Sequence, residues 1–369
     1  MGWDLVSRPR SGQRGARCNG RCILALILFW LSVLLGACQG EGEGAPDRAE
    51  EARNSANQNI ASHEPTSTDD AASSAMMEGG TPNEEYAAAL RATEYLIGAA
   101  PELDQIWSVT TFDRLYKIAP TEELARRIKR LFDEAMARPI VHVPERLNSP
   151  RLLEERELKP ILFELWRRKM TGAPWKEQAA EIESFLVAHE GEFWPPIRPT
   201  QQLVFFYLFH RIDIETRRTK EDVARELHEL WAKGNREQLV RNARFMYPVT
   251  HVIYVDTGYG DRFLDPADYP IEVEILDTSL ARYAVRFPTN PMFIHLAFEV
   301  LTSRRFLQLP DTAEARAVKA KLLLLQDESG CWRPGTGTDA IHATREAVHA
   351  LGQFPRELRR LEPLVPSRR

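Results

Sequence analysis

Apolar side chains recur at helical spacing along most of the chain from residue 84 onward. Between residues 121 and 137, Leu124, Ile128, Leu131 and Ala135 fall on one helical face, and charged residues occupy the opposite face. No run of alternating apolar and polar residues is long enough to predict a β-strand. The pattern predicts twelve helices, at residues 84–99, 102–118, 121–137, 153–170, 175–189, 200–211, 220–233, 236–254, 270–286, 291–303, 311–326 and 340–353.

Sequence signals for helix starts agree with these boundaries. Thr219 is followed three positions later by Asp222, and Asp311 by Glu314, and both pairs resemble capping boxes. In such a box the two side chains satisfy backbone N–H groups that the first helical turn leaves free. We therefore expect helices to begin directly after Thr219 and Asp311.

The twelve helices form six hairpins at a spacing of about 45 residues, which predicts an all-α fold. Two architectures share this local pattern. One is a closed α/α toroid of about six hairpins, with inner and outer helices, and the other is an open helical-repeat solenoid. The irregular helix lengths and the absence of a repeat motif favour the toroid.

Residues 1–37 have the three parts of a lipoprotein signal peptide. Five arginines precede an apolar run from Ile23 to Leu35, which is too short to span a bilayer, since a spanning helix needs about 20 residues. The run ends in Leu35-Gly36-Ala37-Cys38, an aliphatic residue and two small ones before a cysteine. We expect cleavage before Cys38 and attachment of a lipid, such as diacylglycerol and palmitate, to this cysteine.

Residues 38–83 are predicted to form a disordered tether between the lipidated cysteine and a helical domain at residues 84–362. The segment is rich in Gly, Glu, Asp, Ser and Ala and has few large apolar side chains, so it cannot bury enough surface to offset its ordering entropy. The predicted location is the cell envelope, with the membrane as partner through the anchor. Gln39, rather than an aspartate, favours the outer membrane facing the periplasm if the host is Gram-negative.

Charge and cysteine content narrow the classes of partner. The formal net charge is −5, and removal of the leader, which carries +4, leaves −9. This acidity argues against nucleic acid as a partner, because phosphate binding requires a clustered basic surface. Once Cys38 is lipidated, Cys331 is the last thiol, and no Cys/His spacing typical of a zinc site is present. We therefore predict no metal and no cofactor.

Two short segments resemble stretches of known protein families. Residues 326–332 (Q-D-E-S-G-C-W) and the helical stretch after them resemble the Q-x-x-x-G-x-W turn of α/α-toroid proteins related to terpenoid cyclases and prenyltransferases. Residues 247–256 (Y-P-V-T-H-V-I-Y-V-D) are similar to a stretch of an uncharacterised bacterial lipoprotein family assigned to the same fold. The resemblance implies the toroid fold alone. The aspartate-rich motif of the cyclases is missing, so cyclase activity is not implied.

His251, Tyr254 and Asp256 are the candidate catalytic residues. His251 and Tyr254 lie about one helical turn apart, and Asp256 is expected in a polar loop next to Gly258. A histidine, a tyrosine and a carboxylate can together perform general acid–base catalysis. The alternative is a buried histidine that binds backbone and an aspartate that caps a turn.

Four further polar residues and two tryptophans are candidate ligand contacts. His295 with Glu299, and His342 with Glu346, are each spaced by four residues, so the carboxylate can orient the histidine or make an ordinary contact within the helix. Trp194 stands in a proline-rich stretch and could stack on a sugar ring, and Trp332 is the last residue of the Q-x-x-x-G-x-W turn.

Two functions fit these expectations. The first is an exported, membrane-anchored lipoprotein with a helical binding or scaffold domain for a glycan or peptide ligand. The alternative is an extracytoplasmic enzyme that acts on a polysaccharide by general acid–base hydrolysis or elimination. The missing catalytic signatures favour the first, and the His251 group favours the second.

Overall fold

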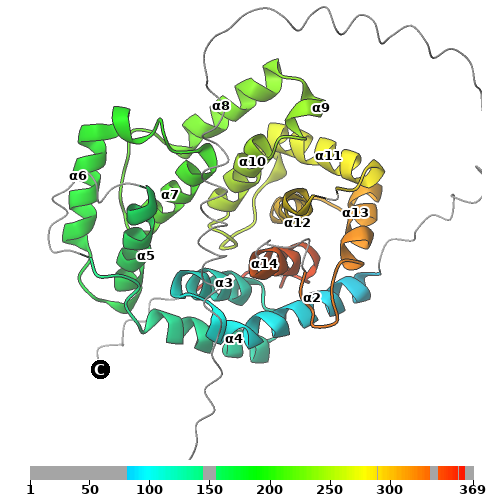
Figure 1. The fold of residues 1–369 in the computed structure, drawn as a ribbon, viewed down its shortest axis with the longest axis horizontal. Helices are drawn as coiled ribbons and strands as arrows, with labels where there is room; N and C mark the ends of the chain where they lie inside the picture. The colour runs from blue at the N-terminus through cyan, green and yellow to red at the C-terminus, as the bar shows by residue number, and fades with distance from the viewer. Residues whose placement is uncertain (1–80, 144–154, 289, 333–339, 356, 362–369) are drawn as a thin grey trace, which may run out of the picture. The chain divides into compact units, whose positions relative to one another are not determined.

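The described part of the protein consists of helices and the turns between them (Figure 1). The computed structural model describes residues 81–143, 155–288, 290–332, 340–355 and 357–361. The α-helices in these residues are α2 (Pro82–Gly98), α3 (Gln105–Ile118), α4 (Glu122–Met136), α5 (Glu155–Thr171), α6 (Lys176–Phe193), α7 (Pro199–Arg211), α8 (Lys220–Lys233), α9 (Arg236–Leu239), α10 (Ala243–Asp256), α11 (Pro270–Val285), α12 (Pro291–Phe306), α13 (Ala313–Leu323) and α14 (Ala340–Leu351).

The all-α class is therefore confirmed for the described residues, in which no strand is present. Two short 3₁₀ turns, Ala100–Glu102 and Pro266–Asp268, complete the regular structure described. The predicted signal peptide, Cys38 and the tether as far as residue 80 lie outside the described residues. Within the described residues, no helix is both long enough and apolar enough to cross a lipid bilayer.

Capping residues explain where several helices begin. Thr219 and Asp222 form the predicted capping box at the start of α8, and Thr81 forms another with Glu84 at the start of α2. The prediction for α13 was one residue early, because the side chain of Thr312, rather than Asp311, caps this helix. These contacts satisfy N–H groups that the first turn cannot satisfy internally.

The predicted helix at residues 236–254 is wrong as a single element. It breaks after Leu239, and the side chain of Asn242 accepts a hydrogen bond from the backbone N–H of Arg244 to begin α10. Asparagine is a strong N-cap because its short side chain reaches the first free N–H groups. The break matters because α10 carries much of the candidate site.

The second helices of the hairpins pack against one another around the centre of the helical unit. α5 contacts α7, α7 contacts α10, α10 contacts α12, α12 contacts α14, and α14 contacts α3. Outside them, α2 packs on α14, α4 on α3, α8 on α7 and α10, α11 on α12, and α13 on α11 (Figure 1). The last helix thus packs on the first two. Such contacts favour the closed alternative, since the end pairs of an open solenoid contact only their sequence neighbours.

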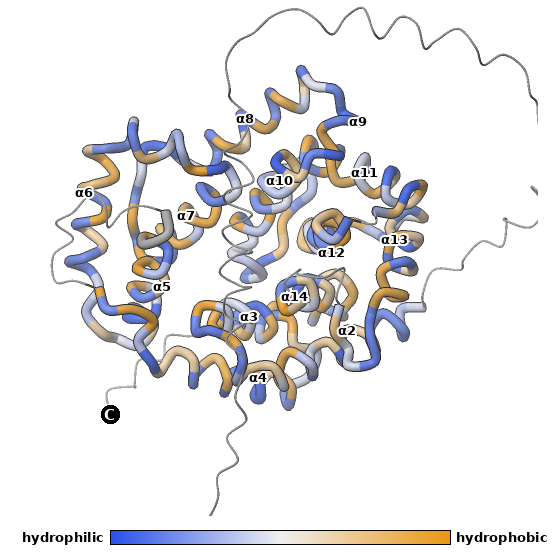
Figure 2. Tube along the Cα trace, viewed as in Figure 1, coloured by the Kyte–Doolittle hydropathy of each residue, from blue (hydrophilic) through white to orange (hydrophobic). Residues whose placement is uncertain are grey.

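Helices of the inner and outer layers differ in burial. Polar and apolar residues are interspersed along the outer helices α4, α6 and α8 (Figure 2), as expected for helices with one buried face. In α12, by contrast, 12 of 16 residues are buried, including His295, Glu299 and Thr302. Because α12 is enclosed on all sides, its polar side chains must find partners on neighbouring inner helices.

The Q-x-x-x-G-x-W turn joins the two ends of the helical unit. Nε2 of Gln326 donates to the carbonyl of Ala88 in α2 at 2.8 Å and to the carbonyl of Gly330 at 3.0 Å. The indole N–H of Trp332 donates to the carbonyl of Leu322 at 2.8 Å, at the end of α13. The turn therefore binds backbone groups at a helix end, as its sequence predicts, and also links α13 to α2.

Candidate functional site

Four inner helices each present a stripe of side chains spaced by four and then three residues. These positions lie on one face of a helix. The stripes are Trp107, Thr111 and Arg114 on α3, Tyr247, His251 and Tyr254 on α10, His295, Glu299 and Thr302 on α12, and His342, Glu346 and His349 on α14.

The stripes meet through direct contacts at the centre. The hydroxyl of Tyr254 donates to Oε2 of Glu346 at 3.0 Å, which joins α10 to α14. The rings of His295 and His342 are in T-shaped contact with centroids 4.1 Å apart, which joins α12 to α14. His251 lies 3.9 Å from Glu299, measured from Nδ1 to Oε2. Six of the nine residues that the sequence predicted are therefore brought together.

Glu346 is an ionised carboxylate held by two arginines. Its Oε1 accepts hydrogen bonds from Arg114 at 2.7 Å and from Arg345 at 2.9 Å. Burial alone would raise the pKa of Glu346, but the two guanidinium groups outweigh burial and hold this pKa well below its usual range. The ring of His342 lies 3.5 Å from the same oxygen.

Glu299 has the opposite electrostatic character. Burial, reinforced by the negative charge of Glu346, raises the pKa of Glu299 to about 8, so its carboxyl group is largely protonated at neutral pH. Oε2 accepts a hydrogen bond from the hydroxyl of Thr250 at 2.6 Å. Oε1 lies 3.4 Å from Nε2 of His295. The centre thus holds one protonated and one ionised carboxyl group.

His251, His342 and His349 are neutral at pH 7, because burial lowers the pKa of each. Burial, together with the nearby Arg114, lowers the pKa of His251 to about 3, and burial lowers the pKa of His349 to about 4. The side chain of His342 is 32% exposed and that of His251 13%, whereas Glu299 and Glu346 are each 1% exposed. The two histidines therefore mark the side from which solvent approaches the carboxyl groups.

Tyr259 covers the other side of the centre with a strained backbone. Its φ angle is +56°, in the left-handed region that residues with a Cβ rarely adopt, and it stands between Gly258 and Gly260, which also have positive φ. The Tyr259 ring lies 4.1 Å from the guanidinium of Arg114 and packs against Tyr254. The strained backbone of the turn after α10 therefore places the aromatic ring of Tyr259 against the guanidinium group of Arg114.

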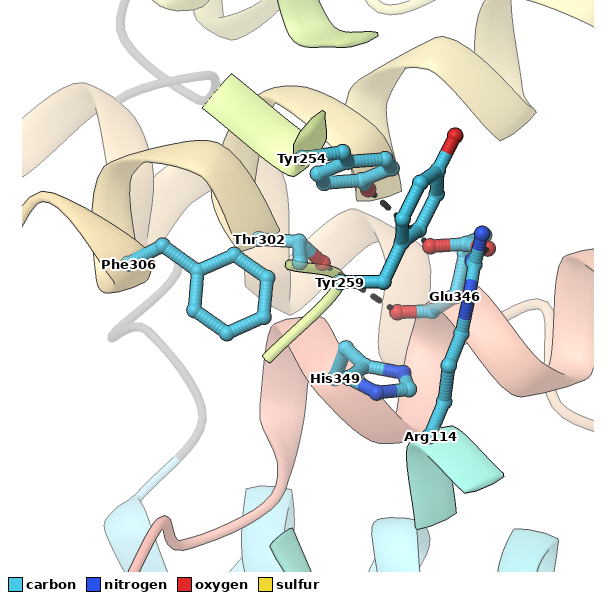
Figure 3. Close-up of a pocket in the computed structure, with 7 residues that line it drawn as sticks. All are labelled: Arg114, Tyr254, Tyr259, Thr302, Phe306, Glu346 and His349. Carbon is cyan, nitrogen blue, oxygen red and sulfur yellow. Dashed lines mark hydrogen bonds and ion pairs between the residues drawn. The ribbon is translucent and has the colours of Figure 1, made fainter. Parts of the chain in front are cut away.

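A narrow cavity lies between these side chains (Figure 3). It is lined by Arg114, Tyr254, Tyr259, Thr302, Phe306, Glu346 and His349. In Figure 3 the hydrogen bonds of Tyr254 and Thr302 converge on Glu346. The cavity has no room for a water molecule, and the most exposed side chain in contact with Glu346 is His342.

Metal-ligating atoms also cluster at this centre. Within the described part of the chain, His295, Glu299 and His342 form a group whose ligand atoms lie within 4.8 Å of one another. Tyr247 supports the group from outside, with its hydroxyl 2.9 Å from Nδ1 of His295. No sequence spacing marks all three members together, because His342 comes from a helix that is distant in sequence from the helix of His295 and Glu299.

Asp256 does not belong to the centre. It is the last residue of α10 rather than a loop residue, and its side chain pairs with Lys220 of α8. Two residues along a helix turn by about 200°, so Asp256 and Tyr254 point in opposite directions. The predicted trio of His251, Tyr254 and Asp256 is therefore corrected, and Glu299 and Glu346 are the carboxyl groups near His251 and Tyr254.

Both tryptophans predicted as ligand contacts lie in the core. Trp194 is 4% exposed and packs against Phe206 with ring centroids 5.0 Å apart, because α6 extends to Phe193 and places it at the end of a helix. Trp332 is 0% exposed and bonds to Leu322. Neither ring has a surface free for a sugar, so we assign both to packing.

Sequence reasoning missed Arg114, Tyr247 and His349, which complete the centre. None of them stands beside another candidate residue in the chain. The repeated spacing of four and three residues on four predicted helices was the signal that could have found them.

No family model matches the chain, and neither a curated protein nor a solved structure matches it significantly. The family resemblance of residues 247–256 and 326–332 therefore remains a prediction.

Proposed function

We propose that the protein is an envelope lipoprotein whose helical domain is an enzyme that acts by general acid–base catalysis. The observation that carries this proposal is the convergence of His251, Tyr254, His342 and Glu346 from two inner helices, within contact of one another. Buried titratable side chains with strongly shifted pKa values cluster at functional sites, which is why this convergence supports catalysis.

The arrangement supports a division of roles. Glu346 is held ionised by Arg114 and Arg345 and can accept a proton. Tyr254 keeps its proton because burial, with the charge of Glu346 beside it, raises the pKa of Tyr254 well above 10. The partly exposed His342 connects Glu346 to the side of entry. A polysaccharide end or another polar glycan is the substrate class that suits an extracytoplasmic acid–base enzyme.

The lipid anchor on Cys38 belongs to the same proposal. Its support is the arginine-rich start, the 13-residue apolar run and the Leu35-Gly36-Ala37-Cys38 sequence. The polar segment after Cys38 would let the domain stand away from the membrane surface and reach envelope polymers.

Replacement of Glu346 tests the catalytic proposal. We expect Glu346→Gln, which keeps the shape and removes the charge, to lower kcat/KM by about 10²–10⁴-fold on whichever envelope polysaccharide the wild-type protein degrades. Reducing ends report hydrolysis, and ultraviolet absorbance of a new carbon–carbon double bond reports elimination. The matched control is Glu226→Gln, on the outer helix α8 with a side chain 53% exposed, which should keep wild-type activity.

The second candidate is a binding domain without catalysis. The observation that favours it is the lack of room for a water molecule beside Glu346. In that case glycans or peptides would bind near His342 unchanged, and Glu346→Gln would bind them as the wild type does. Binding without turnover by the wild-type protein would decide against the enzyme.

A further inference from the structure

We propose that His295, Glu299 and His342 bind one divalent transition-metal ion, with zinc as the best match. Two imidazole nitrogens and one carboxylate oxygen are a donor set that zinc accepts, and three protein ligands leave a coordination position open. Glu299, which is largely protonated in the metal-free protein, would release its proton to solvent as the ion binds. This inference goes beyond the proposed function, because it assigns an ion to His295 and Glu299, which acid–base catalysis by Tyr254 and Glu346 does not require, and gives His342 a second role.

The distances are close to those of a loaded site. The ligand atoms lie within 4.8 Å of one another, and Nε2 of His295 is 3.4 Å from Oε1 of Glu299. Ligand bonds of about 2.0–2.2 Å in a tetrahedral site put neighbouring ligand atoms about 3.3 Å apart. The His295–Glu299 pair already has this separation. His342 is the most exposed of the three and can close the remaining gap with a small side-chain movement.

Hydrogen bonds hold the ligands in the orientation that an ion requires. The hydroxyl of Tyr247 contacts Nδ1 of His295, so Nε2 of that ring faces Glu299. The hydroxyl of Thr250 donates to Oε2 of Glu299, and Oε1 faces the histidine. Metal-ligating histidines and carboxylates commonly bond to such outer partners, which fix the ring and the tautomer.

The charged side chains near His295, Glu299 and His342 do not prevent the binding of a cation. Arg114 and Arg345 would repel one, but both guanidinium groups bond to Oε1 of Glu346, whose negative charge offsets theirs and which lies 3.5 Å from His342. The buried group is reached from the partly exposed His342. The open coordination position would face the same side, where a water molecule or a substrate oxygen can bind.

Zinc binding by the full-length protein in detergent tests the site. The protein is dialysed against EDTA, reloaded with zinc and analysed by atomic spectroscopy and equilibrium dialysis. We expect one zinc ion per chain. His295→Ala and His342→Ala should each weaken binding by at least about 10-fold, and Tyr247→Phe, which removes only the supporting hydroxyl, by about 10–100-fold. His210→Ala, a change at an exposed histidine of α7, is the matched control and should bind zinc as the wild type does.

A second readout guards against variants that simply fold poorly. Zinc should raise the Tm of the wild-type protein and of His210→Ala, and it should not raise the Tm of His342→Ala, whose side chain is partly exposed and tolerant of truncation. A wild-type protein that retains no zinc, or alanine variants that bind zinc as tightly as the wild type, would overturn the site. Because no substrate is added, this result is independent of the test on Glu346.

Discussion

Two histidine–glutamate pairs with the same spacing lie on neighbouring helices and differ in charge. His295 and Glu299 on α12, like His342 and Glu346 on α14, are separated by four residues and contact each other at 3.4–3.5 Å. The guanidinium groups of Arg114 and Arg345 bond to Glu346. The pKa of Glu346 is therefore lowered, whereas burial raises that of Glu299. Residues other than the paired histidine and glutamate therefore decide the charge of each carboxyl group.

Buried His349 should make stability depend on pH. Burial lowers the pKa of His349 in the folded protein to about 4, from 6.5 when unfolded, so the unfolded chain binds the extra proton first as pH falls. Its contribution to stability is complete above pH 6.5 and is lost as pH falls toward 4. Between pH 7 and pH 5 the loss is about 2 kcal/mol for this one group.

His349→Gln isolates that contribution. The glutamine amide does not titrate and can donate to the carbonyl of Arg345, as the Nδ1 atom of His349 does at 3.0 Å. We expect urea unfolding at pH 7 and pH 5 to show a smaller loss of stability for the variant, by about 2 kcal/mol. His251 and His342 titrate in both proteins and cancel in the comparison. Equal losses in both proteins would contradict a buried neutral His349.

Part of the site follows from sequence because helical spacing is a local property. The pairs His295–Glu299 and His342–Glu346 were predicted from spacing alone, and the structure brings them together. The error over Asp256 came from placing the end of α10 too early, which put a helical residue in a loop. Arg114 could not be assigned from its neighbours, since its partner Glu346 lies 232 residues away.

At the scale of elements, the turn between α13 and α14 depends on a glycine. Gly330 has a φ angle of +89°, and a Cβ atom there would lie 2.6 Å from the carbonyl oxygen of Arg91 in α2. The same turn contains Gln326 and Trp332, whose hydrogen bonds reach the backbones of α2 and α13. Close approach of the turn to α2 therefore requires a residue without a side chain.

Gly330→Ala should destabilise the helical unit. We expect the free energy of unfolding to fall by about 1–3 kcal/mol, because the variant combines an unfavourable φ with a clash against backbone. Chemical denaturation measures the change. Gly98→Ala, at the end of α2 where a Cβ would meet nothing within 4 Å, is the control. It should leave stability unchanged or raise it by up to about 1 kcal/mol. A Gly330 variant as stable as this control would show that the turn does not pack tightly on α2.

Helix boundaries were largely predictable, since apolar spacing and capping residues are read within a few positions. The predicted 220–233 coincides with α8, and 200–211 differs from α7 by one residue. The break between α9 and α10 was not predicted, because apolar spacing runs through residues 240–242 and one asparagine side chain decides the new start. Propensity alone does not resolve such a local competition.

At the scale of the whole molecule, the proposed lipid anchor rests on the sequence before the helices. We expect Cys38→Ala to abolish labelling of the protein by a palmitate analogue and to release it from membranes into the soluble fraction, because cysteine is the acceptor of the lipid. Cys331→Ala is the matched control and should stay lipidated, since this thiol is fully buried. Persistent labelling of the Cys38 variant would refute the anchor.

The contact between α14 and α2, the last and first helices of the described residues, has a consequence for the timing of folding. Gln326 and Ala88 are 238 residues apart, and α14 packs on α2, so the unit cannot close until nearly all of it has left the ribosome. Contacts at such separations form late and slowly. A chain that remains unfolded throughout synthesis can pass through a translocation channel, which accepts unfolded polypeptide. If the protein is exported as proposed, the architecture that encloses the site would thus also delay folding until the chain has crossed the membrane.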